Sequence, residues 1–301
     1  MAALPRRIRG RCYTPPVNEA QDLAPGLYLV ATPIGNLEDI TLRAIRVLKQ
    51  ADLIACEDTR QTQKLLNHYG IETGAISYHE HNEASRAAEL IEKLAKGARI
   101  AVVSDAGTPG VSDPGFRLAS LAIERGIAVI PVPGPVAFIA ALIASRLPAE
   151  SFSFRGFLPP KSGARRRELE KLRQSSQTEV FYEAPHRILE SVEDVVAVLG
   201  AHRPIVVARE LTKIHEEFLR GTAAEILQIL KDRGETKGEI TLLIAPAGSG
   251  EIQVPTTSIR DRVQQLIRDE RLDEKSALKR AAKERGISKS EAYREFQRDR
   301  Q

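Results

Sequence analysis

Short apolar runs alternate with segments of helical periodicity over the first half of the chain. Five apolar runs predict buried strands, at 27–31, 52–56, 75–78, 99–103 and 128–132. Between and after them, apolar residues three and four positions apart predict helices, at 41–50, 59–69, 83–96, 116–125 and 136–145. This alternation is typical of a mainly parallel sheet with helices on both faces.

A second block of the same kind begins near residue 148. Its predicted strands lie at 153–157, 179–182, 205–208 and 240–245, with a further short strand considered at 217–220. Its predicted helices lie at 165–174, 188–199 and 223–232. The pattern therefore predicts the α/β class, with two α/β domains at 26–147 and 148–250.

Both ends of the chain differ from these two blocks. Residues 1–25 contain Pro5, Pro15 and Pro16 and show little apolar periodicity, which predicts a flexible basic tail. Residues 256–301 have the pattern of a small helical unit, with helices predicted at 259–269, 274–285 and 288–298. Gly286 and Ser288 place a turn and an N-cap between the last two, which fits a helix-turn-helix but also many other helical hairpins.

The distribution of charge along the chain is more informative about binding partners than the net charge. The net charge is only +4, but residues 1–25 carry +2 and residues 256–301 carry +4, which leaves −2 for the rest. A third basic cluster comprises Lys161, Arg165, Arg166, Arg167, Lys171 and Arg173. Such patches suit a phosphate backbone, although ordinary solubility explains any single one of them equally well.

Composition also restricts the compartment and the chemistry. The two cysteines, Cys12 and Cys56, give neither a disulfide framework nor the spacing of a metal site, so no metal is expected. Cys56 lies in an apolar run, which indicates a buried thiol in a reducing compartment. No apolar stretch is long enough to span a membrane, and the N-terminal arginines precede no apolar core. We expect a cytoplasmic protein.

Polar, acidic and glycine-rich segments follow the predicted strands of the first block. They lie at 32–36, 57–60, 79–82, 104–115 and 133–135. In an open α/β sheet, ligands bind outside the carboxyl ends of the strands, so these segments predict a binding site at one edge of the sheet. Segments 182–187 and 209–212 follow strands of the second block and could face the same cleft.

The loop at 104–115 is the most informative of these segments. Its three glycines and two prolines indicate a stiff backbone that approaches a ligand closely. It matches neither a P-loop nor the Gly-x-Gly-x-x-Gly fingerprint. With Asp105 and Asp113 and no lysine, it suits a neutral or cationic ligand better than a triphosphate. The alternative is a tight connection without a ligand.

Two further groups of residues could carry chemistry. Glu57 and Asp58, with Arg60 close by, could form a base with a charge partner, or Asp58 could simply be a helix N-cap. His79 and His81 lie on one face of an extended segment, but no further ligands at a suitable spacing support a metal site. We therefore interpret these histidines as surface or RNA-contacting residues.

Six strings of this sequence resemble the ribosomal RNA small subunit methyltransferase I family of the tetrapyrrole-methylase superfamily. They are LYLVATPIGNLEDI (27–40), CEDTR (56–60), SYHEHN (77–82), SDAGTPGVSDPG (104–115), YEAPHR (182–187) and ARELTK (208–213). The resemblance runs in order from about residue 27 to residue 245. It implies a class III fold of two α/β domains with S-adenosylmethionine in the cleft between them, and a homodimer. It also implies 2′-O-methylation of one cytidine in the decoding centre of 16S ribosomal RNA, with the small ribosomal subunit as partner.

Matching the loops of the superfamily implies a set of cofactor contacts in this chain. They are Ile34, Asp105, Ala106, Gly107, Thr108, Val111, Val136, Ala137, Tyr182, Leu211 and Thr241. Relatives often carry serine where this chain has Val136, so a side-chain hydroxyl contact is absent here.

Methyl transfer to a ribose hydroxyl requires alignment and a path for the proton. Our hypothesis from the sequence assigns the proton acceptor to Asp58 or Glu57 and gives Arg60 the role of positioning a phosphate or the base. A methylase of tetrapyrrole precursors and an RNA-binding protein without catalysis are the two alternatives. The basic patches and the helical tail argue against the first, and the polar strand-end edge argues against the second.

Overall fold

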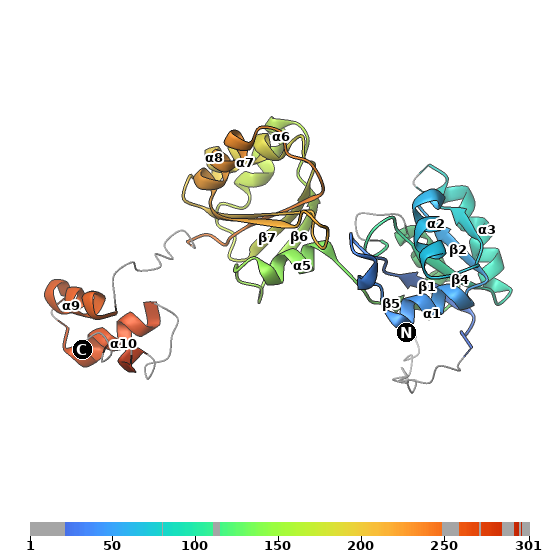
Figure 1. The fold of residues 1–301 in the computed structure, drawn as a ribbon, viewed down its shortest axis with the longest axis horizontal. Coiled ribbons are helices and arrows are strands. Elements are labelled where there is room, and N and C mark those ends of the chain that lie inside the picture. The colour runs from blue at the N-terminus through green and yellow to red at the C-terminus, as the bar shows by residue number, and fades with distance from the viewer. Residues whose placement is uncertain are drawn as a thin grey trace, which may run out of the picture.

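The computed structural model describes residues 22–79, 81–110, 115–248, 259–270, 272–284, 292–294 and 296. Within them lie two five-stranded sheets, each covered by helices, and a separate pair of C-terminal helices (Figure 1). The predicted α/β class with two α/β domains is confirmed.

The first sheet is entirely parallel and has the strand order β3-β2-β4-β1-β5. Its strands are β1 (Gly26–Val30), β2 (Leu53–Cys56), β3 (Ala75–Ser77), β4 (Arg99–Val103) and β5 (Val129–Val132). All five predicted strands are confirmed. Parallel strands bury both faces, which explains why they read as continuous apolar runs in the sequence.

Helices cover the first sheet on both sides. On one face, α1 (Leu42–Gln50) and α2 (Thr59–His68) enclose a core that includes Val47, Leu66 and Val103. On the other face, α3 (Glu83–Ala95) and α4 (Phe116–Glu124) enclose a second core. A short 3-10 turn, η1 (Leu37–Asp39), links β1 to α1. The buried positions of the helices follow the spacing seen in the sequence, so packing on the sheet determines their orientation.

The second sheet is mixed, with the strand order β6-β7-β10-β8-β9. Its strands are β6 (Phe152–Phe157), β7 (Thr178–Glu183), β8 (Pro204–Arg209), β9 (Glu217–Thr222) and β10 (Ile240–Ile244). β6 pairs with β7 in parallel, whereas β10 runs antiparallel to both β7 and β8. The short strand considered at 217–220 is therefore real and pairs with β8 as an antiparallel edge strand.

Three helices cover one face of the second sheet, and α5 covers the opposite face (Figure 1). The three are α6 (Ser162–Glu170), α7 (Ile188–Leu199) and α8 (Ala223–Arg233), the last begun by a capping box between Thr222 and Glu225. α5 (Ala137–Ala144) packs with Ala141 and Leu142 on residues of β7, β8 and β10. By packing, α5 thus belongs with the second sheet, although the sequence pattern assigned it to the segment 26–147.

The last described elements form a small core of their own. α9 (Ile259–Glu270) and α10 (Glu274–Glu284) bury Val263, Leu266 and Ala281 between them. Two of the three predicted C-terminal helices are therefore present as predicted. Gly286 and Ser288, on which the helix-turn-helix interpretation rests, lie outside the described residues.

Half of the basic cluster expected around α6 is paired with acidic partners. Arg165 is 1% exposed, and its Nε lies 2.7 Å from an Asp194 oxygen on α7. Arg166 contacts the other oxygen of Asp194 at 2.5 Å, and Lys171 pairs with Glu168. Three of the six cations therefore hold α6 to the rest of the domain or to its own turn, and phosphate binding stays a prediction for the other three.

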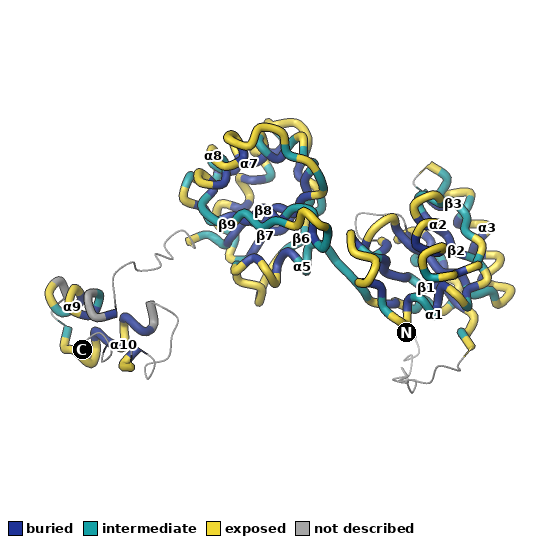
Figure 2. Tube along the Cα trace, viewed as in Figure 1, coloured by how far each residue is buried: buried dark blue, intermediate teal, exposed yellow. Residues whose placement is uncertain are grey.

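Buried residues lie along the strands and on the inward sides of the helices, as Figure 2 shows. Cys56 is a free, buried thiol whose pKa is raised by burial, so the predicted burial of this residue is confirmed. Among the described helices, none has the length and apolarity needed to cross a membrane.

Candidate active site

The carboxyl ends of β1 and β4 are joined by direct backbone bonds. The Thr32 N–H donates to the Gly107 carbonyl at 2.8 Å, and the Gly107 N–H donates back to the Thr32 carbonyl at 3.1 Å. The Thr32 hydroxyl donates to the Ser104 carbonyl at 3.2 Å. Gly107 has φ +82°, a conformation that favours glycine. The loop after β4 is thereby fixed against the loop after β1.

The turn between β5 and α5 completes this edge of the first sheet. The Thr108 hydroxyl donates to the Pro135 carbonyl at 3.4 Å. A Cβ on Gly134 would lie 2.9 Å from the Ala31 Cβ, so only glycine allows the turn to pack this closely on β1. Three of the segments that the sequence placed at the strand ends therefore form one rigid wall.

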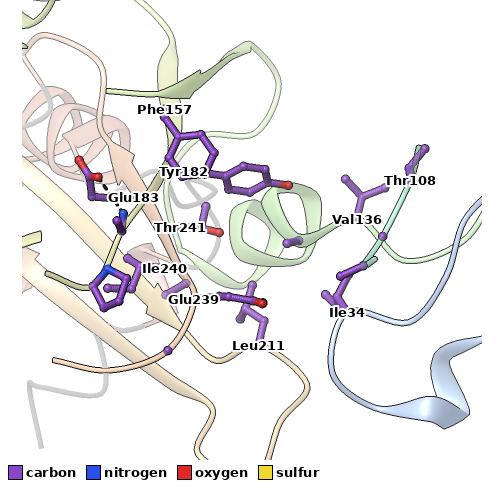
Figure 3. Close-up of a pocket in the computed structure, with 17 residues that line it drawn as sticks. Ile34, Thr108, Val136, Phe157, Tyr182, Glu183, Leu211, Glu239, Ile240 and Thr241 are labelled. Atoms are coloured by element: carbon purple, nitrogen blue, oxygen red, sulfur yellow. Dashed lines mark hydrogen bonds between the residues drawn. The ribbon is translucent and has the colours of Figure 1, made fainter. Parts of the chain in front are cut away.

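A cavity of about 360 Å³ lies between this wall and the second domain (Figure 3). The lining residues from the first wall include Ile34, Thr108 and Val136, and those from the facing wall include Tyr182 and Thr241 (Figure 3). The volume is within the range of small-molecule sites, about 300–1,000 Å³. The full lining is Ile34, Ala106, Gly107, Thr108, Val136, Ala137, Phe157, Tyr182, Glu183, Ala184, Pro185, Ala208, Leu211, Gly238, Glu239, Ile240 and Thr241.

Most of the cofactor contacts implied by the family resemblance line this cavity. They are Ile34, Ala106, Gly107, Thr108, Val136, Ala137, Tyr182, Leu211 and Thr241. Asp105 does not line it, because its Oδ1 turns away to accept a bond from the Asp58 N–H at 3.0 Å. Val111 lies outside the described residues.

The chemistry of the lining fits a neutral or cationic ligand with an apolar part. Among the described lining residues there is no lysine or arginine, whereas Glu239 contributes a carboxylate. α5 begins at the cavity with Val136 as N-cap, and no side-chain bond caps it. Its first N–H groups therefore lack a side-chain acceptor and can bind a ligand carboxylate. S-adenosylmethionine, with its sulfonium, adenosyl group and amino-acid carboxylate, fits this donor set.

An aromatic group forms part of the second-domain wall. The Tyr182 ring lies 4.9 Å from the Phe154 ring and 5.8 Å from the Phe157 ring, measured between centroids. A β-bulge between Phe154 and Phe157, with Gly156 at φ +65°, bends the edge strand at this point. Phe157 lines the cavity and is 56% exposed, so it forms part of the opening.

Glu183 lies beneath the cavity wall and has no free oxygen. One carboxylate oxygen accepts bonds from the Ala184 N–H at 2.8 Å and from Arg187 at 2.6 Å. The other accepts from the Ser191 hydroxyl at 2.6 Å. Glu183 is 2% exposed, so this network is structural and fixes the 182–187 segment that the sequence analysis placed at the cleft.

A tight turn at 210–213 joins the second domain to the first. Glu210 (φ +51°) and Thr212 (φ +64°) both adopt a left-handed backbone conformation that is uncommon outside glycine. In this conformation the Thr212 hydroxyl accepts a bond from the Asn36 N–H at 3.1 Å. We call this contact between the 34–36 loop and the 210–213 turn the interdomain clasp. Ile34 and Leu211, one from each partner, both line the cavity.

The proposed catalytic trio is not at the cavity. Asp58 is the N-cap of α2: its Oδ1 accepts from the Arg60 N–H at 2.8 Å, and the Arg60 guanidinium binds both carboxylate oxygens. These hydrogen bonds from Arg60 lower the pKa of Asp58 to about 2, which makes it a weak proton acceptor. Glu57 does not line the cavity either. The geometry favours the N-cap alternative for Asp58.

The two histidines after β3 lie together, with ring centroids 5.9 Å apart. Asn82 holds this segment: its Oδ1 accepts from the His79 N–H at 2.9 Å, and its amide lies 3.3 Å from a ring nitrogen of the same histidine. Within the described part of the chain, no cluster of three or more metal-ligating side chains occurs. Neither histidine lines the cavity.

Several cavity residues were not predicted, and three of them carry polar or aromatic side chains: Phe157, Glu183 and Glu239. The strand-end pattern predicts the segment that contains Glu183 but not this residue itself. Glu239 was missed because it precedes a strand, β10, and β10 runs antiparallel to its neighbours. The amino end of β10 therefore lies at the edge where the carboxyl ends of β7 and β8 lie, which the sequence alone does not reveal.

Comparison with known protein families shows which family the chain belongs to. The model of the tetrapyrrole (corrin/porphyrin) methylases matches residues 26–227. Ribosomal RNA small subunit methyltransferase I of Halalkalibacterium halodurans is 48% identical over 272 residues, which cover 89% of this chain and 93% of the relative. The chain belongs to the ribosomal RNA small subunit methyltransferase I family of tetrapyrrole methylases. The family resemblance stated from the sequence is confirmed.

Two further comparisons agree with this membership. The enzyme of the same name from Escherichia coli O157:H7 is 45% identical over 269 residues, covering 89% of this chain and 93% of that protein. Among solved structures, uroporphyrin-III C-methyltransferase from Thermus thermophilus, complexed with S-adenyl homocysteine, has a TM-score of 0.53 at 17% identity. That likeness covers 73% of this chain and 97% of the solved chain, and it supports the two-domain fold.

Proposed function

We propose that this chain is an S-adenosylmethionine-dependent methyltransferase that methylates a cytidine 2′-hydroxyl in the decoding centre of 16S ribosomal RNA. The curated relatives that match most of its length carry the name ribosomal RNA small subunit methyltransferase I. Such an enzyme acts in the cytoplasm, where ribosomal subunits are assembled. The observation that carries the proposal is the interdomain cavity, which has a rigid glycine-rich wall and a carboxylate but no described cation in its lining.

The cofactor, when bound, supplies an electrophilic methyl group on a positively charged sulfur. The chain's own residues do the rest of the work. The fixed loops after β1 and β4 shape one side of the cofactor site, and the first turn of α5 offers N–H groups to its carboxylate. Tyr182 and Thr241 line the opposite side of the cavity and would hold the other part of the cofactor.

Methyl transfer also requires that the acceptor hydroxyl be aligned with the methyl group and that little water surround them. Holding the acceptor oxygen and the methyl carbon in line turns a bimolecular encounter into an effectively unimolecular step. The interdomain clasp restrains the separation of the two walls, and the apolar residues Ile34, Leu211 and Ile240 would limit the water around the reacting groups. In this arrangement a metal is not required.

The acceptor RNA would approach from the open side of the cavity, where Phe157 is exposed. Contacts to its phosphates would come from the basic terminal segments and from exposed cations near α6 without an acidic partner, such as Lys161 and Arg167. Arg165, Arg166 and Lys171 of the same cluster pair with carboxylates of the protein instead.

The decisive experiment transfers a radiolabelled methyl group from S-adenosylmethionine to small ribosomal subunits of a strain that lacks this protein. We expect label in a single 2′-O-methylcytidine after nuclease digestion. Label in a methylated base would contradict the ribose assignment. A chain that binds cofactor but labels only a tetrapyrrole precursor would contradict the RNA substrate, and the superfamily's other chemistry would take its place.

The Asp58→Asn variant distinguishes an N-cap from a proton acceptor. Asparagine caps helices as well as aspartate does, so α2 persists. The lost ion pair involves an Arg60 side chain that is 87% exposed, where such pairs contribute little. We expect methyl transfer to small subunits within about twofold of the wild-type rate, since a general base contributes about 100-fold or more. A loss of that larger size would return the proton-accepting role to Asp58.

The chain is further proposed to act as a homodimer through the outer side of α5. This helix is apolar around its whole circumference, yet Ile143 on it is 76% exposed. A helix that is apolar all round is normally buried on every side. We expect sedimentation equilibrium to give twice the monomer mass, and Ile143→Glu to give the monomer. A wild-type monomer at micromolar concentration would contradict the dimer.

A further inference from the structure

The cavity contains one carboxylate whose oxygens remain accessible. Its described lining includes three ionisable side chains, those of Tyr182, Glu183 and Glu239. Both oxygens of Glu183 already accept hydrogen bonds within the protein, and this residue is buried. The Glu239 side chain, by contrast, is 71% exposed while it lines the cavity. In Figure 3 it lies beside Leu211, on the second-domain wall.

The backbone of Glu239 is held rigidly. Its N–H donates to the Glu210 Oε1 at 2.9 Å, and its carbonyl accepts from the Glu210 N–H at 2.9 Å. Its neighbour Gly238 has φ +92°, and a Cβ there would lie 2.4 Å from the Glu210 side chain. The two segments thus fit together only with a glycine at this position, and the Glu239 Cα cannot move relative to the turn.

One cation accompanies the Glu239 carboxylate. The Lys213 Nζ lies 3.2 Å from Glu239 Oε2 and 2.8 Å from Glu210 Oε1. Burial lowers the pKa of Lys213, but the hydrogen bonds and charges of Glu210 and Glu239 outweigh burial and raise it. Lys213 therefore stays protonated. It restricts the rotamers of Glu239 without filling all of its acceptor positions.

The turn that carries Lys213 is the same turn that forms the interdomain clasp. Two non-glycine residues in left-handed conformation in four positions cost roughly 1–3 kcal/mol each, so the surrounding structure must impose them. Such strain concentrates at functional sites. Here it brings the Thr212 hydroxyl to the first domain and the Lys213 ammonium to Glu239.

From this geometry we propose that Glu239, held by Lys213, is the general base that accepts the proton of the acceptor hydroxyl. The inference rests on the proposed function and names a catalytic residue for it. As the bond between the acceptor oxygen and the methyl carbon forms, the bond between that carbon and sulfur breaks and its electron pair stays on sulfur. The hydroxyl proton passes to a Glu239 oxygen and then to water. Lys213 is a positioning residue in this scheme.

The test compares Glu239→Gln with Glu235→Gln in single-turnover methyl transfer to small ribosomal subunits. Glu235 pairs with Lys237 at 3.5 Å, is 77% exposed and does not line the cavity, so it matches Glu239 in exposure and partner. Loss of a general base lowers the rate by about 100-fold or more, whereas Glu235→Gln should behave as wild type. Binding of S-adenosylhomocysteine, measured by calorimetry, should be the same in all three proteins.

The pH dependence supplies a readout that a structural role would not change. The charged groups that surround Glu239 in the described structure are Lys213 and Glu210 of the turn. Arg209 binds the carbonyl of Lys237, two residues before Glu239. The wild-type rate should fall on acidification, because a protonated carboxyl cannot accept a proton. This fall should be absent in Glu239→Gln and present in Glu239→Asp, which keeps a carboxylate.

Each outcome decides between the inference and its alternatives. A full rate for Glu239→Gln, or an unchanged fall on acidification in that variant, would overturn the role of Glu239. Equal losses of rate and of S-adenosylhomocysteine binding would make Glu239 a cofactor contact instead. If the wild-type chain labels no RNA at all while it binds the cofactor, the proposed function fails, and this failure is distinct because it precedes any comparison of variants.

Discussion

A Gly35→Ala variant should bind S-adenosylhomocysteine about 10-fold to 100-fold more weakly than the wild type, since overpacking costs about 1–3 kcal/mol and 1.4 kcal/mol is tenfold. An added Cβ would lie 2.4 Å from the Lys213 Cγ, 2.8 Å from the Thr212 Oγ1 and 2.9 Å from the Leu211 carbonyl oxygen. The lysine side chain can turn aside, but the backbone carbonyl cannot. The variant must therefore separate the 34–36 loop from the 210–213 turn, which widens the cavity between Ile34 and Leu211.

Calorimetric titration with S-adenosylhomocysteine measures this effect, and Gly74→Ala is its matched control. Gly74 belongs to the same domain, and a Cβ there would meet nothing within 4 Å. We expect the control to bind as the wild type does. The far-ultraviolet circular dichroism of both variants should stay unchanged, because each domain keeps its own core. Wild-type affinity in Gly35→Ala would show that the interdomain clasp does not set the width of the cavity.

The largest loss of stability is expected for Asp194→Ala. Arg165 is 1% exposed, and its closest carboxylate is Asp194, at 2.7 Å from its Nε. Removal of one partner of a buried pair leaves an uncompensated charge, which costs about 3–5 kcal/mol. The remaining contacts of Arg165, with Glu190 at 3.4 Å and the Pro160 carbonyl at 3.2 Å, are longer and less direct. The free energy of unfolding of the second domain should fall by this amount.

Urea denaturation of Asp194→Ala tests this value, with Glu193→Ala as the control. Glu193 is the preceding residue on α7, and it pairs with Lys231 at 3.0 Å while 45% exposed. An exposed pair of this kind contributes at most about 1 kcal/mol. Equal losses in the two variants would mean that the buried position of Arg165 contributes nothing beyond a surface pair.

The ion pair between Asp194 and Arg165 also predicts how the stability of the second domain depends on pH. Burial raises the pKa of Asp194, but hydrogen bonds from Arg166, Arg165 and Ser162 outweigh burial and lower it below its ordinary value. A carboxyl with a depressed pKa in the folded state stabilises the fold above its unfolded pKa of about 3.9. That stabilisation is lost as the pH falls below this value. The wild type should therefore lose stability on acidification more steeply than Asp194→Ala.

The first domain was the part of the fold that the sequence predicted best. Its strands are short continuous apolar runs, and its helices have one apolar stripe each, so local pattern and tertiary role coincide. α5 is different. The segment 137–144 is apolar on every side, so its periodicity does not indicate which sheet it covers. Only the packing of Ala141 and Leu142 on the second sheet decides this.

The sequence likewise predicted some residues of the candidate site and missed others. The wall formed by the loops after β1 and β4 followed from the rule that ligands bind at the carboxyl ends of parallel strands. The sequence could not show whether Asp58 is a base or an N-cap, because a carboxylate just before a helix is expected in both cases. Neither the strand-end rule nor helix capping predicts Glu239 at the site. Its position at the cavity depends on the antiparallel direction of β10. The pairing of Arg165 and Arg166 was not predictable for a related reason, because their acidic partner Asp194 lies on another helix.

The position of α5 also determines where this chain can be divided into fragments. A second-domain fragment that began at residue 148 would lack α5 and would expose Val180, Val206 and Leu243 to water. An uncovered apolar sheet face of this kind promotes aggregation. A fragment that begins in the turn at 133–135 keeps the helix and, with it, the cover of that face. Studies of isolated domains, fusions and split reporters should therefore place their junction in this turn, before the helix rather than after it.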